Sequence, residues 1–150
     1  MDAILIDSGA FIALLIEKDD QHVRASGLYA ELIGRRLPLV TTNHVVDETC
    51  THLLYHYPSG HQLALKFGRF IRESTCLLFS QSIDLQAVRG PSVLYTTPDI
   101  ERAAWDIFAR YDTAGFSFTD CVSFAAMQSL GIRKAFTFDK HYDTMGFERL

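Results

Sequence analysis

The stretch FTDCVSFAAMQSLGIRKAFTFD, residues 118–139, predicts a helix followed by a buried strand. Thr119 or Asp120 can cap the start of the helix, because both are side chains that accept backbone N–H bonds at that position. Apolar residues then continue to Gly131, which ends the helix. A short run of apolar and β-branched residues follows, as in a buried strand, and it stops at Asp139. A helix leading into a buried strand is typical of α/β proteins.

The rest of the chain repeats this alternation. We expect strands over residues 1–6, 38–42, 93–96 and 135–138, and helices over residues 10–16, 22–36, 44–57, 62–72, 98–111 and 119–131, with Asp7 or Ser8 capping the first helix and Asn43 the third. The segment between residues 74 and 92 predicts no clear element. Strands that alternate with helices predict a three-layer α/β/α sandwich with a central, mostly parallel sheet.

Length and composition narrow the class of protein. The chain has 150 residues, 48% of them hydrophobic, which predicts one domain over residues 1–150 with a core of its own. No apolar run approaches the roughly 20 residues that a membrane-spanning helix needs, so we expect no membrane association. The three cysteines, Cys50, Cys76 and Cys121, form no paired motif. A reducing, cytoplasmic location is therefore the simpler expectation.

Four carboxylates occupy special places in this pattern. Asp7 and Asp139 directly end predicted strands, Asp120 begins a helix, and Glu48 lies one turn into the helix after the second strand. Carboxyl ends of parallel strands share one edge of a sheet, so these residues can converge on one pocket. Each also has an ordinary interpretation: a helix cap for Asp120, a turn for Asp7 and Asp139, and a solvated helix face for Glu48.

Converging carboxylates need a counter-charge. Negative groups within a few ångströms repel one another, and a divalent cation removes that conflict. Oxygen ligands favour Mg²⁺ or Mn²⁺ over Zn²⁺, and such a cation supports phosphodiester hydrolysis. The net charge of −4 does not exclude a nucleic-acid substrate. Removing the four carboxylates from the 18 acidic residues leaves 14, equal to the number of Lys and Arg.

Four segments carry a resemblance to a known family. They are ILIDSGAFIALL at residues 4–15, TTNHVVDET at 41–49, FSFTDCVSFAAMQSLGI at 116–132 and AFTFDKHYDTMGF at 135–147. Together they resemble the PIN-domain ribonucleases, especially the VapC-like toxins, over essentially the whole chain. The resemblance implies a Mg²⁺- or Mn²⁺-dependent endoribonuclease that acts on RNA. It also implies a small cognate antitoxin protein, and a homodimer.

The resemblance also assigns roles to individual residues. The acidic positions of the family, catalytic and metal-binding, fall on Asp7, Glu48, Asp120 and Asp139. Its small hydroxyl residues near the metal correspond to Ser8 and Thr119, and Asp143 stands where some relatives carry a further acid. Residues 77–90 depart from the usual, shorter family pattern.

Other interpretations remain open at this point. A housekeeping RNA-processing nuclease would share the same site. A receiver-like signalling module also gathers carboxylates and Mg²⁺ at strand ends, although here Ser8 follows Asp7 and no late strand ends in Lys. A structural binding module would follow if the four acids were dispersed.

Smaller motifs have alternatives as well. His44, Glu48, His52 and His56 share a helical stripe that suits zinc, but they lack the HExxH pattern. Lys66, Arg69 and Arg72 form either a track for an RNA backbone or a solvated helix face. We expect core or dimer-interface roles, rather than base stacking, for the aromatic residues Phe11, Phe67, Phe70, Phe116, Phe118, Phe124 and Phe136.

Overall fold

The computed structural model describes residues 2–74 and 90–150. Its central sheet has the strand order β3-β2-β1-β4-β5, and every neighbouring pair is parallel. In chain order the elements are β1 (Ile4–Ile6), α1 (Ser8–Leu15), α2 (His22–Gly34), β2 (Leu39–Thr42), α3 (Asn43–His56), α4 (Gly60–Ser74), β3 (Ser92–Leu94), α5 (Pro98–Arg110), α6 (Phe118–Leu130), β4 (Lys134–Phe136), α7 (His141–Thr144) and β5 (Glu148–Arg149).

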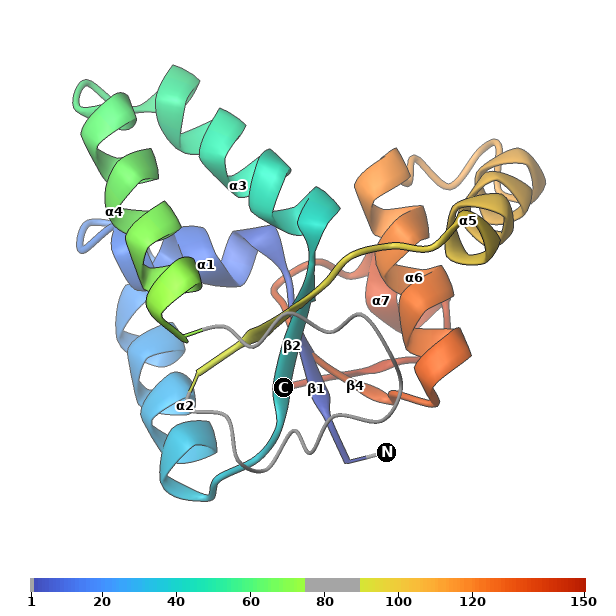
Figure 1. Ribbon diagram of the computed structural model, residues 1–150, viewed down its shortest axis with the longest axis horizontal. Helices are drawn as coiled ribbons and strands as arrows, with labels where there is room; N and C mark the ends of the chain where they lie inside the picture. Colours follow the sequence, from blue (N-terminus) through green and yellow to red (C-terminus); the bar gives the residue numbers. More distant parts are fainter. Residues whose placement is uncertain (1, 75–89) are drawn as a thin grey trace.

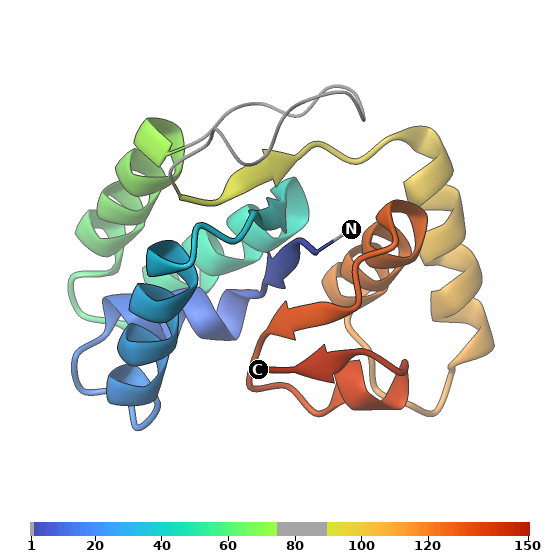
Figure 2. The same ribbon diagram turned by 90° about the horizontal axis from the view of Figure 1, so that it is seen from below.

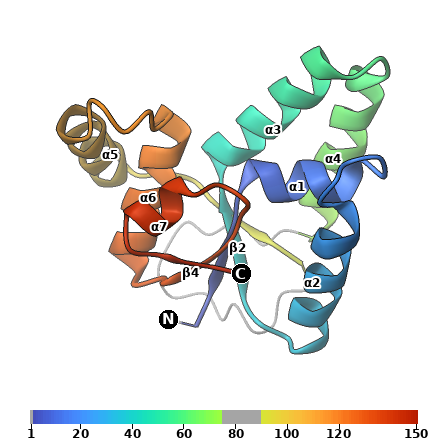
Figure 3. The same ribbon diagram turned by 180° about the vertical axis from the view of Figure 1, so that it is seen from behind.

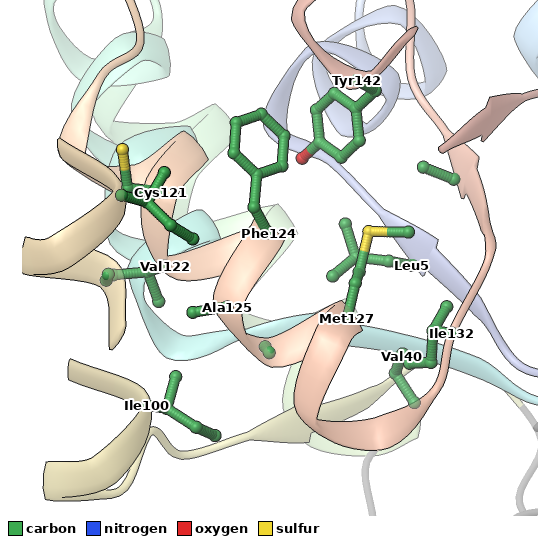
Figure 4. Close-up of a cluster of buried hydrophobic side chains, with 14 of the residues drawn as sticks. Leu5, Val40, Ile100, Cys121, Val122, Phe124, Ala125, Met127, Ile132 and Tyr142 are labelled. Carbon is green, nitrogen blue, oxygen red and sulfur yellow. The ribbon is translucent and has the colours of Figure 1, made fainter. Parts of the chain in front are cut away.

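The helices cover both faces of the sheet, which confirms the predicted three-layer sandwich. Helices α1–α4 lie on one side and α5–α7 on the other in Figure 1, and the views from below and behind agree (Figures 2 and 3). Residues of one strand alternate between two hydrophobic cores because successive side chains point to opposite faces. Ile4 and Ile6 pack with α1–α4, whereas Leu5 packs with α5 and α6. Figure 4 shows the core that contains Leu5, with Leu5 beside Met127 of α6 and Val40 beside Ile132.

The parallel register places the carboxyl ends of β1, β2 and β4 at one edge of the sheet. Residues Ile4 to Ile6 of β1 pair with Lys134 to Phe136 of β4, and Leu5 pairs with Val40 of β2. The carboxyl ends of β1, β2 and β4 therefore lie side by side, and the segments that follow them begin at the same edge. Within the described residues, no helix is long and apolar enough to cross a membrane.

Several predicted helix caps are wrong by a few residues. Thr42, not Asn43, caps α3 and accepts the Val45 N–H. Asn43 instead accepts the N–H of Thr96 and so ties α3 to the segment after β3. Ser117, rather than Thr119 or Asp120, caps α6.

The predicted end of β4 also needs correction. This strand ends at Phe136, so Asp139 lies three residues beyond it rather than directly at its end. The helix α7 and the strand β5 were not predicted. Cys76 and residues 77–89 lie outside the described residues, so the expected departure from the family pattern is not addressed there.

Gly60, at the start of α4, shows why the turn after α3 is tight. A Cβ at this position would overlap the backbone carbonyls of Leu53 and Leu54, so only glycine allows α4 to pack so closely on α3. The hairpin of α3 and α4 depends on this contact.

Candidate active site

The four predicted carboxylates meet at the carboxyl edge of the sheet. Asp7 is the first residue after β1, and Glu48 lies in the second turn of α3, which follows β2 without a loop. Asp120 lies in the first turn of α6, and Asp139 follows β4. Short contacts connect the four residues. Ser8, next to Asp7, bonds Glu48, and Thr137 bonds both Asp7 and Asp139. His141 lies near both Asp139 and Asp120. The acids are therefore not dispersed.

Asp7 is the most deeply buried of the four. It has 4% of its surface exposed, and the Thr137 hydroxyl donates to its Oδ2 at 2.9 Å. Its Oδ1 is buried and has no partner within the described residues. Burial raises the pKa of Asp7 to about 7, against the Thr137 bond, which lowers it. Asp7 stands at the N-cap of α1, but its side chain makes no capping bond. The Asp7 carboxylate is thus held by Thr137 and not by a capping bond.

Glu48 is oriented by the residue that follows Asp7. The Ser8 hydroxyl donates to Glu48 Oε2 at 2.7 Å, joining α1 to α3 across the site. Burial raises the pKa of Glu48, and the charge of Asp120 adds to that effect, whereas the Ser8 bond opposes it. The Ser8 bond therefore fixes the orientation of the Glu48 carboxylate.

Asp120 combines a structural and a chemical role. Its Oδ2 accepts the Ser117 N–H at 2.8 Å while Ser117 Oγ accepts the Asp120 N–H, which forms a capping box. Burial raises its pKa, against these bonds from Ser117. Asp120 therefore belongs to the capping box at the N3 position, while Ser117 is the N-cap itself. The neighbouring Cys121 is buried, and burial raises its pKa to about 11, so it is no thiolate nucleophile.

Asp139 brings with it a histidine that the sequence did not single out. His141 Nδ1 lies 3.1 Å from Asp139 Oδ2 and 3.7 Å from Asp120 Oδ2. The backbone N–H of His141 also donates to Asp139 Oδ1 at 2.9 Å. Asp120, Asp139 and His141 form a group of ligand atoms close enough to hold a metal ion.

Thr137 is the second functional candidate missed in the sequence. Its hydroxyl donates to Asp7 and accepts the N–H of Asp139 at 3.0 Å, so one side chain links two carboxylate residues. It reads in the sequence as an ordinary strand residue. Only the pairing of β1 with β4 shows that it faces Asp7.

Thr119 and Asp143 were the lesser candidates for the site. Thr119 lies in the first turn of α6 beside Asp120. Asp143 is bound by Arg149, whose guanidinium approaches its Oδ2 at 2.7 Å, and this bond lowers the pKa of Asp143. Its carboxylate is therefore occupied by an arginine.

The chemistry of these groups fits a divalent cation. Buried carboxylates with raised pKa values are poorly compensated as anions, and the unpartnered Oδ1 of Asp7 is an oxygen without a donor. A hard cation would supply the missing positive charge to Asp7, Glu48, Asp120 and Asp139.

The alternative motifs do not form a comparable site. His44 Nε2 lies 2.8 Å from Glu101 Oε1, and the His52 and His56 rings stack with their centroids 4.1 Å apart. The histidine stripe is therefore not gathered around Glu48.

The basic and aromatic side chains have separate places. Lys66, Arg69 and Arg72 are exposed on α4. Phe11, Phe67, Phe116, Phe124 and Phe136 are buried in the two cores, and Phe70 packs partly buried against one of them. Phe118 is half-buried against the exposed Trp105, with ring centroids 4.3 Å apart.

Comparison with known proteins identifies relatives that match nearly the whole chain. The chain is 33% identical over 145 residues to the 23S rRNA-specific endonuclease VapC20 of Mycobacterium tuberculosis (strain CDC 1551 / Oshkosh), covering 96% of this chain and 95% of the relative. It is 30% identical over 142 residues to a VapC ribonuclease of Archaeoglobus fulgidus, covering 93% and 79%.

A solved structure has the same fold. The crystal structure of Mycobacterium tuberculosis VapC20, described as a sarcin-ricin loop cleaving toxin, matches with a TM-score of 0.75 and 31% identity. The match covers 96% of this chain and 95% of that one. The PIN domain family model matches residues 4–148, so the receiver-like alternative is set aside. With its parallel sheet and clustered carboxylates, this chain belongs to the PIN domain family.

Proposed function

We propose that this protein is a metal-dependent endoribonuclease and the toxin component of a toxin–antitoxin pair, built as one PIN domain over residues 1–150. The observation that carries the proposal is the meeting of four carboxylates at one sheet edge, with a buried Asp7 oxygen left without a donor. The family and the relatives named as ribonucleases support it.

The side chains divide into ligands and supports. When bound, Mg²⁺ or Mn²⁺ activates water and stabilises the charge that develops on the scissile phosphate. Asp7 and Asp120 would hold the cation directly. Glu48, fixed at Oε2 by Ser8, would orient the attacking water through Oε1. Asp139 would contribute through water.

We propose RNA as the substrate, with a small antitoxin protein as inhibitor. The relative from Mycobacterium tuberculosis is named for 23S rRNA, which supports a structured RNA target. An RNA target of this kind would place the protein in the cytoplasm.

We further propose a homodimer. Trp105 and Phe108 of α5 are 57% and 43% exposed and make tilted and edge-on ring contacts with Phe118, which packs at the edge of one core. Together these rings form an aromatic surface. Aromatic side chains grouped on a surface are characteristic of protein interfaces. Light scattering on the wild type and on Trp105→Glu tests this contact: we expect a dimer and a monomer, respectively.

Cleavage of purified RNA tests the enzymatic proposal. We expect cleavage in Mn²⁺, none in excess EDTA, and none by Asp7→Asn. Asp112→Asn is the control, because Asp112 is exposed and lies outside the site. Full cleavage in EDTA, or by Asp7→Asn, would contradict the proposal.

A growth experiment separates a toxin from a housekeeping nuclease. Induction of the wild type should arrest growth, whereas induction of Asp7→Asn should not. Co-expression of the small protein encoded beside it should relieve the arrest. Unimpeded growth with active enzyme would favour RNA processing.

A further inference from the structure

Three buried polar atoms without partners lie around the inner side of the site. Within residues 2–74 and 90–150, the unpartnered buried side-chain atoms include Asp7 Oδ1, Ser123 Oγ and Tyr142 Oη. They come from the end of β1, from α6 and from α7, segments far apart in the sequence. Buried polar groups almost always have a hydrogen-bond partner, so three neighbouring atoms without one need an explanation.

Tyr142 is held so that its hydroxyl cannot reach solvent. Its side chain is completely buried, and its ring packs edge-on against Phe124 with centroids 4.9 Å apart. Phe147 packs against the same ring. Figure 4 shows the Tyr142 ring beside Phe124, with the hydroxyl oxygen on the side that faces Phe124. The backbone N–H of Tyr142 donates a hydrogen bond to the carbonyl oxygen of Asp139.

Asp7 and Ser123, which carry the other two unpartnered atoms, both act on this hydroxyl. Burial raises the pKa of Tyr142 well above its ordinary value, the charge of Asp7 adds to that effect, and the Ser123 hydroxyl opposes it. A phenol hydroxyl is a hydrogen-bond donor, and the Asp7 carboxylate oxygen without a partner is an acceptor. A Phe at this position would fill the same space without burying a hydroxyl.

We propose that Tyr142 is a positioning residue of the site, whose buried hydroxyl donates to Asp7 Oδ1 in the active state while Ser123 donates to Tyr142 Oη. Thr137 already holds Oδ2, so the two donors together fix both oxygens of Asp7. Each oxygen keeps a lone pair for a cation. The inference rests on the proposed function, since it concerns the orientation of a metal ligand.

The expected effect is that of removing a partner that orients a ligand. Such substitutions reduce metal affinity or activity about 10- to 100-fold. Tyr142→Phe removes one oxygen and keeps the packing against Phe124. We expect its Mn²⁺ dissociation constant to rise about 10- to 100-fold, with the Michaelis constant for RNA unchanged. Ser123→Ala should weaken Mn²⁺ binding less.

The experiment measures Mn²⁺ binding to the full chain by titration calorimetry at pH 8. Tyr111→Phe is the matched control, because Tyr111 packs at the edge of the same core, away from Asp7. We expect its Mn²⁺ affinity to equal that of the wild type. Urea unfolding of each variant in EDTA gives a second, metal-free measurement.

The outcomes separate this inference from the proposed function. A wild type that binds no Mn²⁺ contradicts the proposed function; the inference is then decided in EDTA, where Tyr142→Phe should be less stable than the wild type. Greater stability of Tyr142→Phe than of the wild type would mean that the Tyr142 hydroxyl has no hydrogen-bond partner in the folded protein, which would overturn the inference. Where the wild type binds Mn²⁺, an affinity of Tyr142→Phe within twofold of it overturns the inference. If Tyr142→Phe does not fold, Ser123→Ala decides: an Mn²⁺ affinity equal to that of the wild type overturns the inference, and a weaker one supports it.

Discussion

Replacing Asp7 by Asn should stabilise the metal-free protein at alkaline pH while it abolishes cleavage. Burial raises the pKa of Asp7 from 3.8 to about 7. When a carboxyl group has a raised pKa in the folded state, the protein loses stability as the pH rises. The loss occurs between the pKa of that group in the unfolded state and its pKa in the folded state. At pH 8, ionising Asp7 therefore costs the folded state on the order of 4 kcal/mol. Asn carries no charge, so this cost disappears in the variant.

Comparison of two pH values isolates the charge. The Asn amide adds a buried donor with a cost of about 1–3 kcal/mol, but that cost is the same at every pH. At pH 5 the folded wild type is already protonated at Asp7, so most of the penalty is absent. The effect of the substitution on the free energy of unfolding should therefore be more favourable at pH 8 than at pH 5 by roughly 3 kcal/mol.

Urea unfolding followed by circular dichroism in EDTA provides the measurement. Asp112→Asn is the control for an exposed carboxylate, and we expect its effect to differ little between the two pH values. If Asp7→Asn changes stability equally at pH 5 and pH 8, the carboxyl does not have a raised pKa, and the description of a buried acidic cluster is wrong.

Three further predictions concern the supports of the site and the fold. Ser8→Ala removes the donor to Glu48 and should slow cleavage about 10- to 100-fold without unfolding the protein; an unchanged rate would show that Glu48 needs no such support. Gly60→Ala should destabilise the protein by about 1–3 kcal/mol in urea unfolding, because its Cβ would overlap the Leu53 carbonyl, whereas Gly68→Ala on the same helix meets open space and should not. Mn²⁺ should raise the melting temperature more at pH 8 than at pH 5, because protons on the carboxylates compete with the metal; an equal rise would contradict carboxylate binding.

The sequence predicted the convergence of the acids because their positions follow from topology. Asp7 follows a short apolar run, and the parallel sheet brings the ends of such runs together. The predictions that were wrong or missing concern local features of the chain. Thr119 or Asp120 was predicted to cap α6, whereas Ser117 is the N-cap and Asp120 completes a reciprocal capping box three residues later. The four-residue α7 and two-residue β5 are shorter than any hydrophobic period can identify.

The missed residues depend on contacts between distant segments. Thr137 and Asp7 are 130 positions apart, and nothing in either neighbourhood predicts their hydrogen bond. His141 follows Asp139 by two positions, which in sequence is only a polar turn. Its place beside Asp120 requires α6 and α7 to be packed together. Tyr142 reads as an apolar core residue, and only burial of its hydroxyl near Asp7 suggests another role.

The central claim is that distant carboxylates at one sheet edge bind a divalent cation. Anomalous X-ray scattering from crystals grown with Mn²⁺ tests it most directly. We expect a peak within coordination distance of carboxylate oxygens of both Asp7 and Asp120. No peak there at saturating Mn²⁺, or a peak only elsewhere on the chain, would contradict the claim.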